Sequence, residues 1–280
     1  MRLLIEKIKL GLQKRTKVTS KKKSFASWNA KGYNNSPEVT FIFQSHNKSL
    51  QLMHVIPKLR SFPSAEIIVI DDGSDPEHTS RLTNFLTGAN EFLFRSNDLY
   101  ENITYDRTIR MANGNYVALL QDDDDFEDTP WVSAAVSYFK KYPRMAILGG
   151  KGGLDIAFEH DRHYAHGGVP MNKSDFTFVT AVNRAPMWLN KELYMQYLHH
   201  IDYTFAPFQF DDYEICARTW LCGLQVGWYD AKFKSLSVGG MRLWNSAFTE
   251  EQSAKNGRRL YDMYVDKIDS IHEAIKNSIY

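Results

Sequence analysis

The stretch Tyr116-Val-Ala-Leu-Leu-Gln-Asp-Asp-Asp-Asp-Phe-Glu-Asp128 decides the fold of this chain. Its first part, Tyr116 to Leu120, is a short apolar run that contains a β-branched residue. Asn113-Gly114-Asn115 precedes the run, and a segment of helical character opens at Pro130. This pattern predicts a buried strand of a parallel sheet, followed by a helix.

The predicted strand runs directly into four carboxylates, Asp122, Asp123, Asp124 and Asp125. Two like charges ~4 Å apart at an effective dielectric of ~20 repel each other by ~4 kcal/mol. Such crowding therefore predicts a cation among the carboxylates. Mg²⁺ or Mn²⁺ suits oxygen ligands from one or two carboxylates that are completed by substrate phosphates. The alternative is a solvated acidic turn.

Working outward, strands and helices alternate with short connections. We expect strands at residues 39–43, 66–70, 92–94, 116–120 and 145–148, and helices at 49–59, 76–86, 103–112 and 131–142. This alternation predicts an α/β fold with a doubly wound, mostly parallel sheet and helices on both faces. In such sheets ligands bind outside the carboxyl ends of the strands.

Three polar segments follow predicted strands and should meet at one edge of the sheet. They are Gln44-Ser45-His46-Asn47, Asp71-Asp72 and the run Asp122–Asp125. Because parallel strands end on the same edge, these segments predict one acidic crevice built from three loops.

The second half of the chain gives weaker signals. Residues 149–175 are rich in glycine and predict a flexible lid or an acceptor-binding loop. His160, His163 and His166 lie in this segment, where a zinc site is the less favoured alternative. We expect strands at 176–183 and 224–229, and helices at 191–199, within 208–218 and from 250 onward. Trp188 and Trp244 belong either to the core or to an acceptor site.

The net charge of +1 conceals an asymmetry. Ten Lys and Arg residues against Glu6 alone give residues 1–31 a charge of +9, so the remainder carries −8. Leu4, Ile8 and Leu12 form one helical stripe within residues 1–23. The alternatives are a helix on an anionic membrane surface, a helix docked on the body and a disordered tail. Residues 24–38 have the composition of a linker.

Composition narrows the class of protein further. No apolar run approaches ~18 residues, so no membrane-spanning helix is expected. Glu6, Lys7 and Lys9 interrupt the N-terminal apolar residues, which argues against a signal peptide. Cys216 and Cys222 lack the spacing of metal ligands and are expected to be reduced thiols. We expect a cytoplasmic protein, either free or peripheral at the inner face of a membrane, with no nucleic acid as partner of the acidic body.

Four motifs resemble the family 2 glycosyltransferases of the GT-A fold. Val39 to Asn47 resembles the first strand of that family, and Val69-Ile-Asp-Asp-Gly-Ser74 its Val-Val-Asp-Asp-Gly-Ser. The segment from Gly114 to Asp124 is similar to its Gly-x-Tyr-Ile-x-x-Leu-x-x-Asp-Asp, and Asp211 to Arg218 to its Glu-Asp-x-Asp/Glu-Leu-x-x-Arg. The resemblance covers residues 39–245. It implies a glycosyltransferase domain at 39–248, which composition and periodicity place between a basic arm and linker at 1–38 and a C-terminal helix at 249–280 that packs on the domain or extends from it.

The resemblance also implies roles for single residues. Asp72, with Asp71 beside it, would bind the nucleobase, next to a wall formed by Gln44, Ser45, His46 and Asn47. Asp122 would lie near the ribose, and Arg107 would reach the diphosphate. Asp123 would hold Mn²⁺ or Mg²⁺, with Asp124 as the competing ligand. Asp212 would deprotonate the acceptor hydroxyl, with Asp211 as its alternative.

This sequence departs from the family pattern in three places. Gln121 replaces the first residue of the usual Asp-x-Asp, so the register of the aspartates is ambiguous by one. No His lies near Val238-Gly-Gly-Met241, where many relatives carry a metal ligand. Tyr105-Asp-Arg-Thr108 differs from the usual Ala-Arg-Asn-x-Gly, which weakens the role of Arg107.

The resemblance implies transfer of a sugar, with inversion, from a nucleoside-diphosphate donor such as a UDP-sugar. The acceptor would be a glycan or a lipid-linked molecule, as in polysaccharide biosynthesis. One alternative is a sugar nucleotidyltransferase, which would want a glycine-rich phosphate loop that Gln44 to Lys48 does not supply. Another is a non-catalytic module that binds a cation or a nucleotide-sugar.

Overall fold

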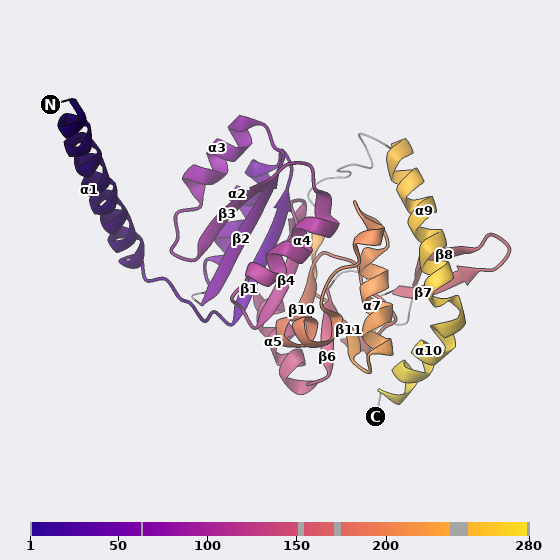
Figure 1. Ribbon diagram of the computed structural model, residues 1–280. Helices are drawn as coiled ribbons and strands as arrows, with labels where there is room; N and C mark the ends of the chain where they lie inside the picture. Colours follow the sequence, from indigo (N-terminus) through magenta and orange to yellow (C-terminus); the bar gives the residue numbers. More distant parts are fainter. Residues whose placement is uncertain (1, 63, 151–153, 171–174, 236–245, 279–280) are drawn as a thin grey trace.

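The computed structural model describes residues 2–62, 64–150, 154–170, 175–235 and 246–278. These residues form an eight-stranded sheet with the order β3-β2-β1-β4-β10-β6-β11-β9 (Figure 1). Its strands are β1 (Val39–Ser45), β2 (Ala65–Asp72), β3 (Glu91–Ser96), β4 (Tyr116–Gln121), β6 (Met145–Gly149), β9 (Phe176–Phe178), β10 (Met187–Asn190) and β11 (Gln225–Tyr229). β10 and β9 run antiparallel to their neighbours, and the other strands are parallel, so the predicted mostly parallel sheet is confirmed.

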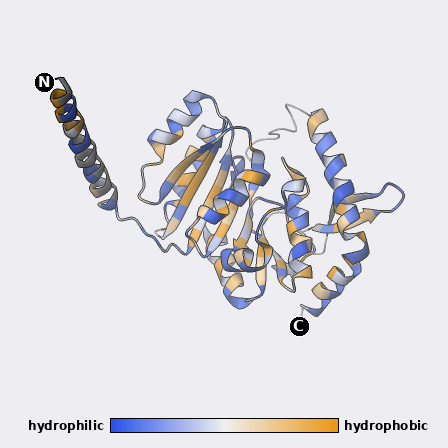
Figure 2. Cartoon of the chain, viewed as in Figure 1, coloured by the Kyte–Doolittle hydropathy of each residue, from blue (hydrophilic) through white to orange (hydrophobic). Residues whose placement is uncertain are grey.

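Helices cover both faces of this sheet. One face carries α2 (Ser49–Leu59), α3 (Pro76–Phe85) and α5 (Pro130–Lys141), and the other carries α4 (Tyr100–Met111), α7 (Asp211–Leu221), α9 (Ser246–Tyr264) and α10 (Ile268–Asn277). Alternate residues of each strand enter the two cores, as Phe41 and Phe43 do on one side and Ile42 on the other. Each such side chain stabilises the fold by roughly 1.5–3 kcal/mol through burial. The strands accordingly form the apolar centre of the molecule (Figure 2).

The glycine-rich segment 149–175 is not the loop without regular structure that its sequence predicts. Its described part contains the hairpin of β7 (Leu154–Glu159) and β8 (Tyr164–Pro170), which lies beside α9 (Figure 1). A methyl group added at Gly149 would come within 2.4 Å of the Val182 side chain. This glycine therefore allows two backbone segments to pack closely, and its presence does not signal flexibility.

The region between β9 and α7 also differs from expectation. The strand expected at 176–183 ends at Phe178. The four-residue strand β10, which lies between β4 and β6, was not predicted. The helix expected at 191–199 is a short α6 (Lys191–Leu193) continued by a π-helical turn (Tyr194–Leu198). Trp188 on β10 is fully buried and donates its indole N–H to the hydroxyl of Tyr229, 3.0 Å away, so it belongs to the core. Trp244 lies outside the described residues.

The N-terminal helix is longer than its apolar stripe indicates. Helix α1 (Arg2–Asn29) continues into the segment that composition assigns to a linker, and it stands away from the body of the molecule (Figure 1). After α1 the chain is attached to the body by hydrogen bonds between Asn34 and Asn90, the first of them 2.9 Å long. Among the described residues, no helix has both the length and the apolar character needed to cross a membrane.

Candidate functional site

The predicted polar segments meet at one edge of the sheet. Ser45 on β1 is paired with Asp71 on β2, and Gln44 is paired with Gln121 on β4. The loops that follow these strands are joined directly. The backbone N–H of His46 donates to the Asp122 carboxylate at 2.9 Å, and Nδ1 of His46 donates to the carbonyl of Asp72 at 2.7 Å. The three loops that were expected to meet at one edge of the sheet therefore lie together there.

Asp72 is buried, and its carboxylate accepts several hydrogen bonds from the protein. The donors are Ser96 Oγ at 2.7 Å, Gln44 Nε2 at 3.3 Å, and the backbone N–H groups of Leu99 and Tyr100 at 3.0 and 2.8 Å. The last two groups belong to the N-terminal end of α4, where a negative charge is favoured by the helix dipole. Asp72 thus fixes the position of α4 and the side chain of Gln44.

The rest of the first two loops is tied together by side chains. Asp71 is also buried and accepts hydrogen bonds from the Ser74 N–H and the Thr79 hydroxyl. Asn47, with a φ of 57°, receives the N–H of Asp75 at 2.8 Å. Ser45 is 1% exposed, and its hydroxyl has no hydrogen-bond partner among the described residues. A buried hydroxyl without a partner is costly and is a candidate contact for a bound ligand.

The aspartate run is not a cluster of equivalent carboxylates. Asp122 accepts the His46 N–H and forms an ion pair with Lys48 at 3.1 Å. Burial raises the pKa of Asp122, although the attraction of Lys48 opposes this rise. Asp123 is only half-buried and accepts a hydrogen bond from the hydroxyl of Ser235 at 3.2 Å.

The last two aspartates of the run have different partners. Asp124 is 1% exposed, and its carboxylate accepts the N–H of Gln121 at 2.8 Å. Asp125 forms an ion pair with Lys58 at 2.7 Å, and this partner lowers the pKa of Asp125 although burial acts to raise it. The backbone of both residues forms β5 (Asp124–Asp125), which pairs with β12 (Lys234–Ser235).

These residues fit a cation whose other ligands come from a substrate. Within the described residues, no group of three or more His, Cys, Asp and Glu side chains could hold a metal ion. Mg²⁺ bound to a substrate diphosphate needs only one or two protein carboxylates. Asp123 is the most accessible carboxylate of the run that has no Lys or Arg in an ion pair with it among the described residues. The three histidines of the β7–β8 region have separate contacts: His160 and His163 lie against Tyr261, and His166 pairs with Glu159.

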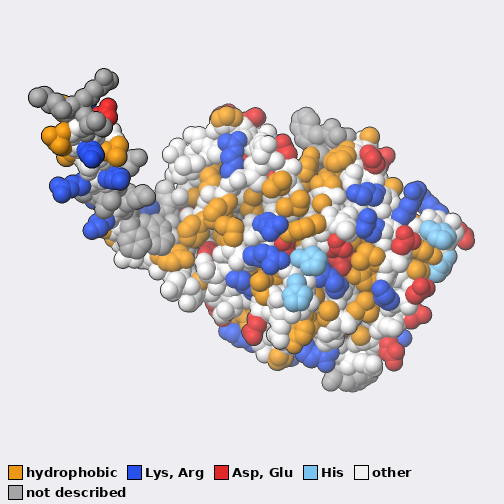
Figure 3. Space-filling model, viewed as in Figure 1, with side chains coloured by type: hydrophobic (Ala, Val, Ile, Leu, Met, Phe, Trp, Pro, Cys, Tyr) orange, Lys and Arg blue, Asp and Glu red, His pale blue; other side chains and the backbone are white. Residues whose placement is uncertain are grey.

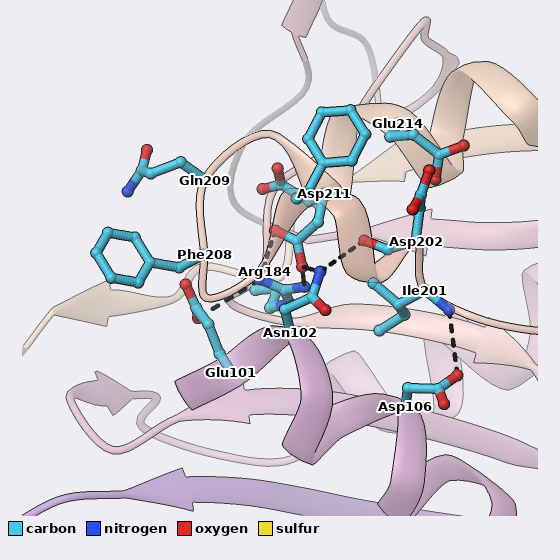
Figure 4. A network of polar contacts seen from close by, with 12 residues as sticks. Glu101, Asn102, Asp106, Arg184, Ile201, Asp202, Phe208, Gln209, Asp211 and Glu214 are labelled. Atoms are coloured by element: carbon cyan, nitrogen blue, oxygen red, sulfur yellow. Dashed lines mark hydrogen bonds and ion pairs between the residues drawn. The ribbon is translucent and has the colours of Figure 1, made fainter. Parts of the chain in front are cut away.

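The second acidic group is organised around a buried arginine. Asp211, at the start of α7, is 1% exposed and binds Arg184 through both guanidinium Nη atoms, the shorter contact being 2.5 Å. Asn102 of α4 donates to the same carboxylate at 3.2 Å, and Glu101 lies 3.5 Å from Arg184 on the other side (Figure 4). Although burial lowers it, the charges of Asp211 and Glu101 raise the pKa of Arg184 overall.

Asp212 is adjacent in sequence to Asp211 but lies in a different environment. Its carboxylate is half-buried and accepts the N–H of Tyr213 at 3.0 Å, and it forms no ion pair among the described residues. Burial, followed by the charge of Asp211, raises the pKa of Asp212 to about 7, against the attraction of Arg184. A carboxylate of this kind is a good proton acceptor near neutral pH.

Tyr105 connects the two acidic groups. Its hydroxyl donates to the carbonyl of Leu120, at the end of β4, at 2.7 Å. The guanidinium of Arg184 lies over the face of the same ring, 5.0 Å from its centroid. The chain of contacts from β4 through Tyr105 and Arg184 to Asp211 therefore links the start of α7 to the end of the strand that carries the aspartate run.

Arg107 is not joined to this arrangement. It is exposed on α4, where its guanidinium lies 5.5 Å from the centroid of the Tyr203 ring. Among the described residues it forms no ion pair with the aspartates. Sequence reasoning missed Arg184, Glu101 and Lys48, because no motif includes them. The unusual Tyr105-Asp-Arg-Thr108 segment was noticed, but its partners became visible only in the structure.

Comparison with known proteins decides the family. The sequence model of glycosyl transferase family 2 matches residues 33–209, which is more than half of the chain. The chain belongs to this family. The match includes β1, β2, β4, the aspartate run and Arg184, and it ends just before Asp211. No curated protein sequence matches the chain.

Solved structures agree with this assignment of fold. The mannosyltransferase PcManGT from Pyrobaculum calidifontis, solved in complex with GDP-Man and Mn²⁺, is similar with a TM-score of 0.54 and 12% identity, over 76% of this chain and 61% of that one. TarS 1–349 from S. aureus, in complex with UDP-GlcNAc, is similar with a TM-score of 0.55 and 14% identity, over 74% and 61%. This family 2 chain has the GT-A fold of these proteins and spans about three fifths of their lengths.

Proposed function

We propose that this chain transfers a sugar from a nucleoside-diphosphate donor to a hydroxyl group of an acceptor. The observation that carries the proposal is the pair at the start of α7. Asp211 is neutralised by Arg184, whereas Asp212 keeps an accessible carboxylate whose pKa is raised to about 7 by burial and by Asp211. Family membership and the GT-A fold support the same activity.

In this proposal Asp212 is the base of the reaction, and Asp211 supports it. The acceptor oxygen forms a bond to the anomeric carbon while the bond from that carbon to the diphosphate oxygen breaks. The proton of the acceptor hydroxyl passes to the Asp212 carboxylate. A single displacement of this kind inverts the anomeric centre, and its transition state resembles an oxocarbenium ion.

The aspartate run would bind the donor. Asp122, held by Lys48 and the His46 N–H, would bind the ribose, and Asp123, whose carboxylate is only half-buried, would hold the cation. Asp124 is the weaker candidate because it is buried and already accepts the Gln121 N–H. A bound Mn²⁺ or Mg²⁺ would neutralise the charge that develops on the departing diphosphate. PcManGT was solved with Mn²⁺, which supports a divalent cation here.

For the nucleobase we propose direct contacts from four residues at and just after the C-terminal end of β1, namely Gln44, Ser45, His46 and Asn47. The partnerless hydroxyl of Ser45 supports this choice. Asp72 would act through Gln44 and His46, both of which it binds, while Asp71 holds the loop that follows β2. The guanidinium of Arg107 would have to move away from the Tyr203 ring before it could bind the diphosphate.

A panel of nucleotide-sugars incubated with the protein and Mn²⁺ tests the proposal. GDP-sugars and UDP-sugars both belong in the panel, because the similar structures bind one of each. Release of nucleoside diphosphate supports the transferase. Formation of nucleoside triphosphate on adding pyrophosphate would support a sugar nucleotidyltransferase instead. Binding of a nucleotide-sugar without turnover under any of these conditions would support a non-catalytic module.

We also propose that α1 brings the enzyme to a glycan or lipid-linked acceptor at an anionic membrane surface. Leu4, Ile8 and Leu12 are 64%, 55% and 58% exposed and lie along one stripe of α1. On the face drawn in Figure 3, the described part of α1 carries basic side chains among the apolar ones. Such a helix binds anionic lipid through its apolar stripe and its positive charge together.

Sedimentation with vesicles that contain phosphatidylserine tests this role of α1. Replacing Leu4, Ile8 and Leu12 by Gln in the full chain should abolish binding. Leu10→Gln is the matched control, because Leu10 is 57% exposed but lies off the stripe. If the wild-type protein does not bind these vesicles, the membrane proposal is wrong. The test of sugar transfer by donor hydrolysis is independent of that result.

A further inference from the structure

A pocket lies between the β7–β8 hairpin and helix α9, outside the donor site. Its volume is about 380 Å³, within the range of roughly 300–1,000 Å³ that is usual for small-molecule sites. Polar and charged side chains form much of its lining, among them Arg162, Tyr164, His166, Glu250, Ser253 and Arg258. On the face drawn in Figure 3, basic, acidic and histidine side chains gather over the hairpin.

The pocket is built into the fold beside the proposed base. The hydroxyl of Tyr164 donates to the carbonyl of Ser253 at 3.1 Å, and the close approach of the ring to α9 requires Gly257. The ring of Tyr164 also packs edge-on against Phe210, with centroids 6.2 Å apart. Phe210 immediately precedes Asp211 and Asp212. One wall of the pocket therefore contacts the residue that leads into the catalytic pair.

Helix α9 also holds the loop at residues 205–210, which leads into α7. Asn256 donates to the carbonyls of Phe205, Phe208 and Gln209, at 2.8 to 3.0 Å. Gln209 and Phe210 have φ values of 76° and 66°, a conformation that costs energy for residues with a side chain. These hydrogen bonds stabilise the strained loop that leads into Asp211 and Asp212.

The charges of the pocket favour an anion. Arg162 reaches it from the hairpin and Arg258 from α9. Arg258 is exposed and forms no ion pair among the described residues, and Arg162 has one 3.4 Å contact with Glu159 while 72% exposed. Arginine is well suited to carboxylate and phosphate groups because its donors are arranged as a planar fork. Glu250 and Ser253 add partners for hydroxyl groups.

We infer that this pocket binds an acidic sugar of the acceptor, one that carries a carboxylate or a phosphate group, and so presents the neighbouring hydroxyl to Asp212. The inference rests on the proposed glycosyl transfer and names the acceptor class. A sugar satisfies both features of the lining, since its anionic group meets the two guanidinium groups and its hydroxyls meet Glu250 and Ser253.

Direct binding to the full chain, measured by ligand-observed NMR, tests the pocket. The compounds are glucuronate, which has a carboxylate at C6, glucose 6-phosphate, which has a phosphate at the same position, and glucose, which has no anionic group. Glucuronate or glucose 6-phosphate should bind more tightly than glucose, and the tighter of the two identifies the anion. Arg258→Gln should weaken that binding about tenfold, as expected for loss of a charge-assisted hydrogen bond. Lys255→Gln, which removes an exposed charge of α9 outside the pocket, should leave it unchanged.

Equal binding of glucose and the acidic sugars, an unchanged affinity in Arg258→Gln, or no binding of any of them would overturn the inference. Hydrolysis of the nucleotide-sugar without acceptor, measured on the same variants, separates this result from the proposed function. Arg258→Gln should hydrolyse donor at the wild-type rate. If the wild-type chain hydrolyses no donor yet binds acidic sugars through Arg258, the transferase proposal fails while the site itself stands.

Discussion

The two acidic regions of this molecule differ in how the fold treats their charges. In the run Asp122–Asp125 each carboxylate has its own partner: Lys48 for Asp122, Ser235 for Asp123, the Gln121 N–H for Asp124 and Lys58 for Asp125. In the pair Asp211–Asp212 one carboxylate is paired with Arg184, and the other has no ion pair among the described residues and a raised pKa. The longer run is the more conspicuous in sequence, but the shorter pair contains the carboxylate whose pKa is raised to about 7.

Adjacent carboxylates therefore differ in role according to the side chains and backbone groups that each of them contacts. A charge that is paired and buried contributes to structure, and its removal leaves an uncompensated partner. A charge that is buried without a cation partner gains chemical reactivity, because its protonated and ionised forms become close in free energy. The following predictions test this division, from the largest expected effect to the smallest.

Asp212→Asn should reduce the rate of sugar transfer by about 10³-fold, because general-base catalysis typically contributes 10²- to 10⁴-fold. The variant should remain folded, since Asp212 forms no ion pair among the described residues. Initial rates with a donor and acceptor pair identified by the panel measure the effect. Binding of the nucleotide-sugar, followed by thermal shift, is the control and should not change. Transfer at the wild-type rate would remove Asp212 from the mechanism.

Asp211→Asn should lower the free energy of unfolding by about 3–5 kcal/mol, because it leaves the buried Arg184 charge without its main partner. Arg184→Met should have a similar cost through Asp211 and Glu101. Urea unfolding measures both. The double variant, with both charges removed, should recover part of the loss. Two single variants with wild-type stability would show that the pair does not hold α7 in place.

Asp123→Asn should lower transfer by about 100-fold or more and weaken the dependence on Mn²⁺, because loss even of an outer-shell partner of a metal ligand typically costs about 10- to 100-fold. Asp125→Asn is the matched control within the same run, because the Asp125 carboxylate is bound to Lys58. Its rate should stay within a few-fold of wild type. Titration of Mn²⁺ against the transfer rate distinguishes the two. A larger loss in Asp125→Asn than in Asp123→Asn would place the metal ligand elsewhere in the run.

The pH dependence should show the raised pKa of Asp212. The base must be ionised, so the transfer rate should fall about tenfold per pH unit below pH 7 and level off above it. Stability should follow the opposite course. Because the folded protein holds this proton more tightly than the unfolded chain, folding stability decreases as pH rises from about 4 to 7.

Asp212→Asn removes that titration. It should therefore raise the free energy of unfolding at pH 8 by on the order of 1 kcal/mol, and leave it nearly unchanged at pH 4. Thermal unfolding at the two pH values measures the difference. Equal stability of wild type and variant at both pH values would show that the Asp212 carboxylate is not perturbed.

Much of the sheet edge that carries the acidic segments could be predicted from local sequence. The alternating apolar strands and helices, and the position of Asp71-Asp72 and Asp122–Asp125 after strands, follow from short-range rules. The elements that were predicted wrongly depend on contacts between residues far apart in the sequence. β10 has only four residues, and its pairing with β4 and β6 involves residues about 40 to 70 positions away. Gly149 was predicted to belong to a flexible loop because its close packing against Val182 leaves no local signal in the sequence.

By itself, the sequence determined the family, the parallel half of the sheet and the edge at which the acidic segments meet, because hydrophobic periodicity and motif order act over short stretches of chain. Only the tertiary structure decided which carboxylates are paired with a cationic side chain and which one has its pKa raised to about 7. Lys48, Lys58 and Arg184 reach their aspartates from 74, 67 and 27 positions away, and only their folded positions bring these charges within a few ångströms of one another. Electrostatic interaction depends on that distance and on burial, and neither can be read from the order of residues.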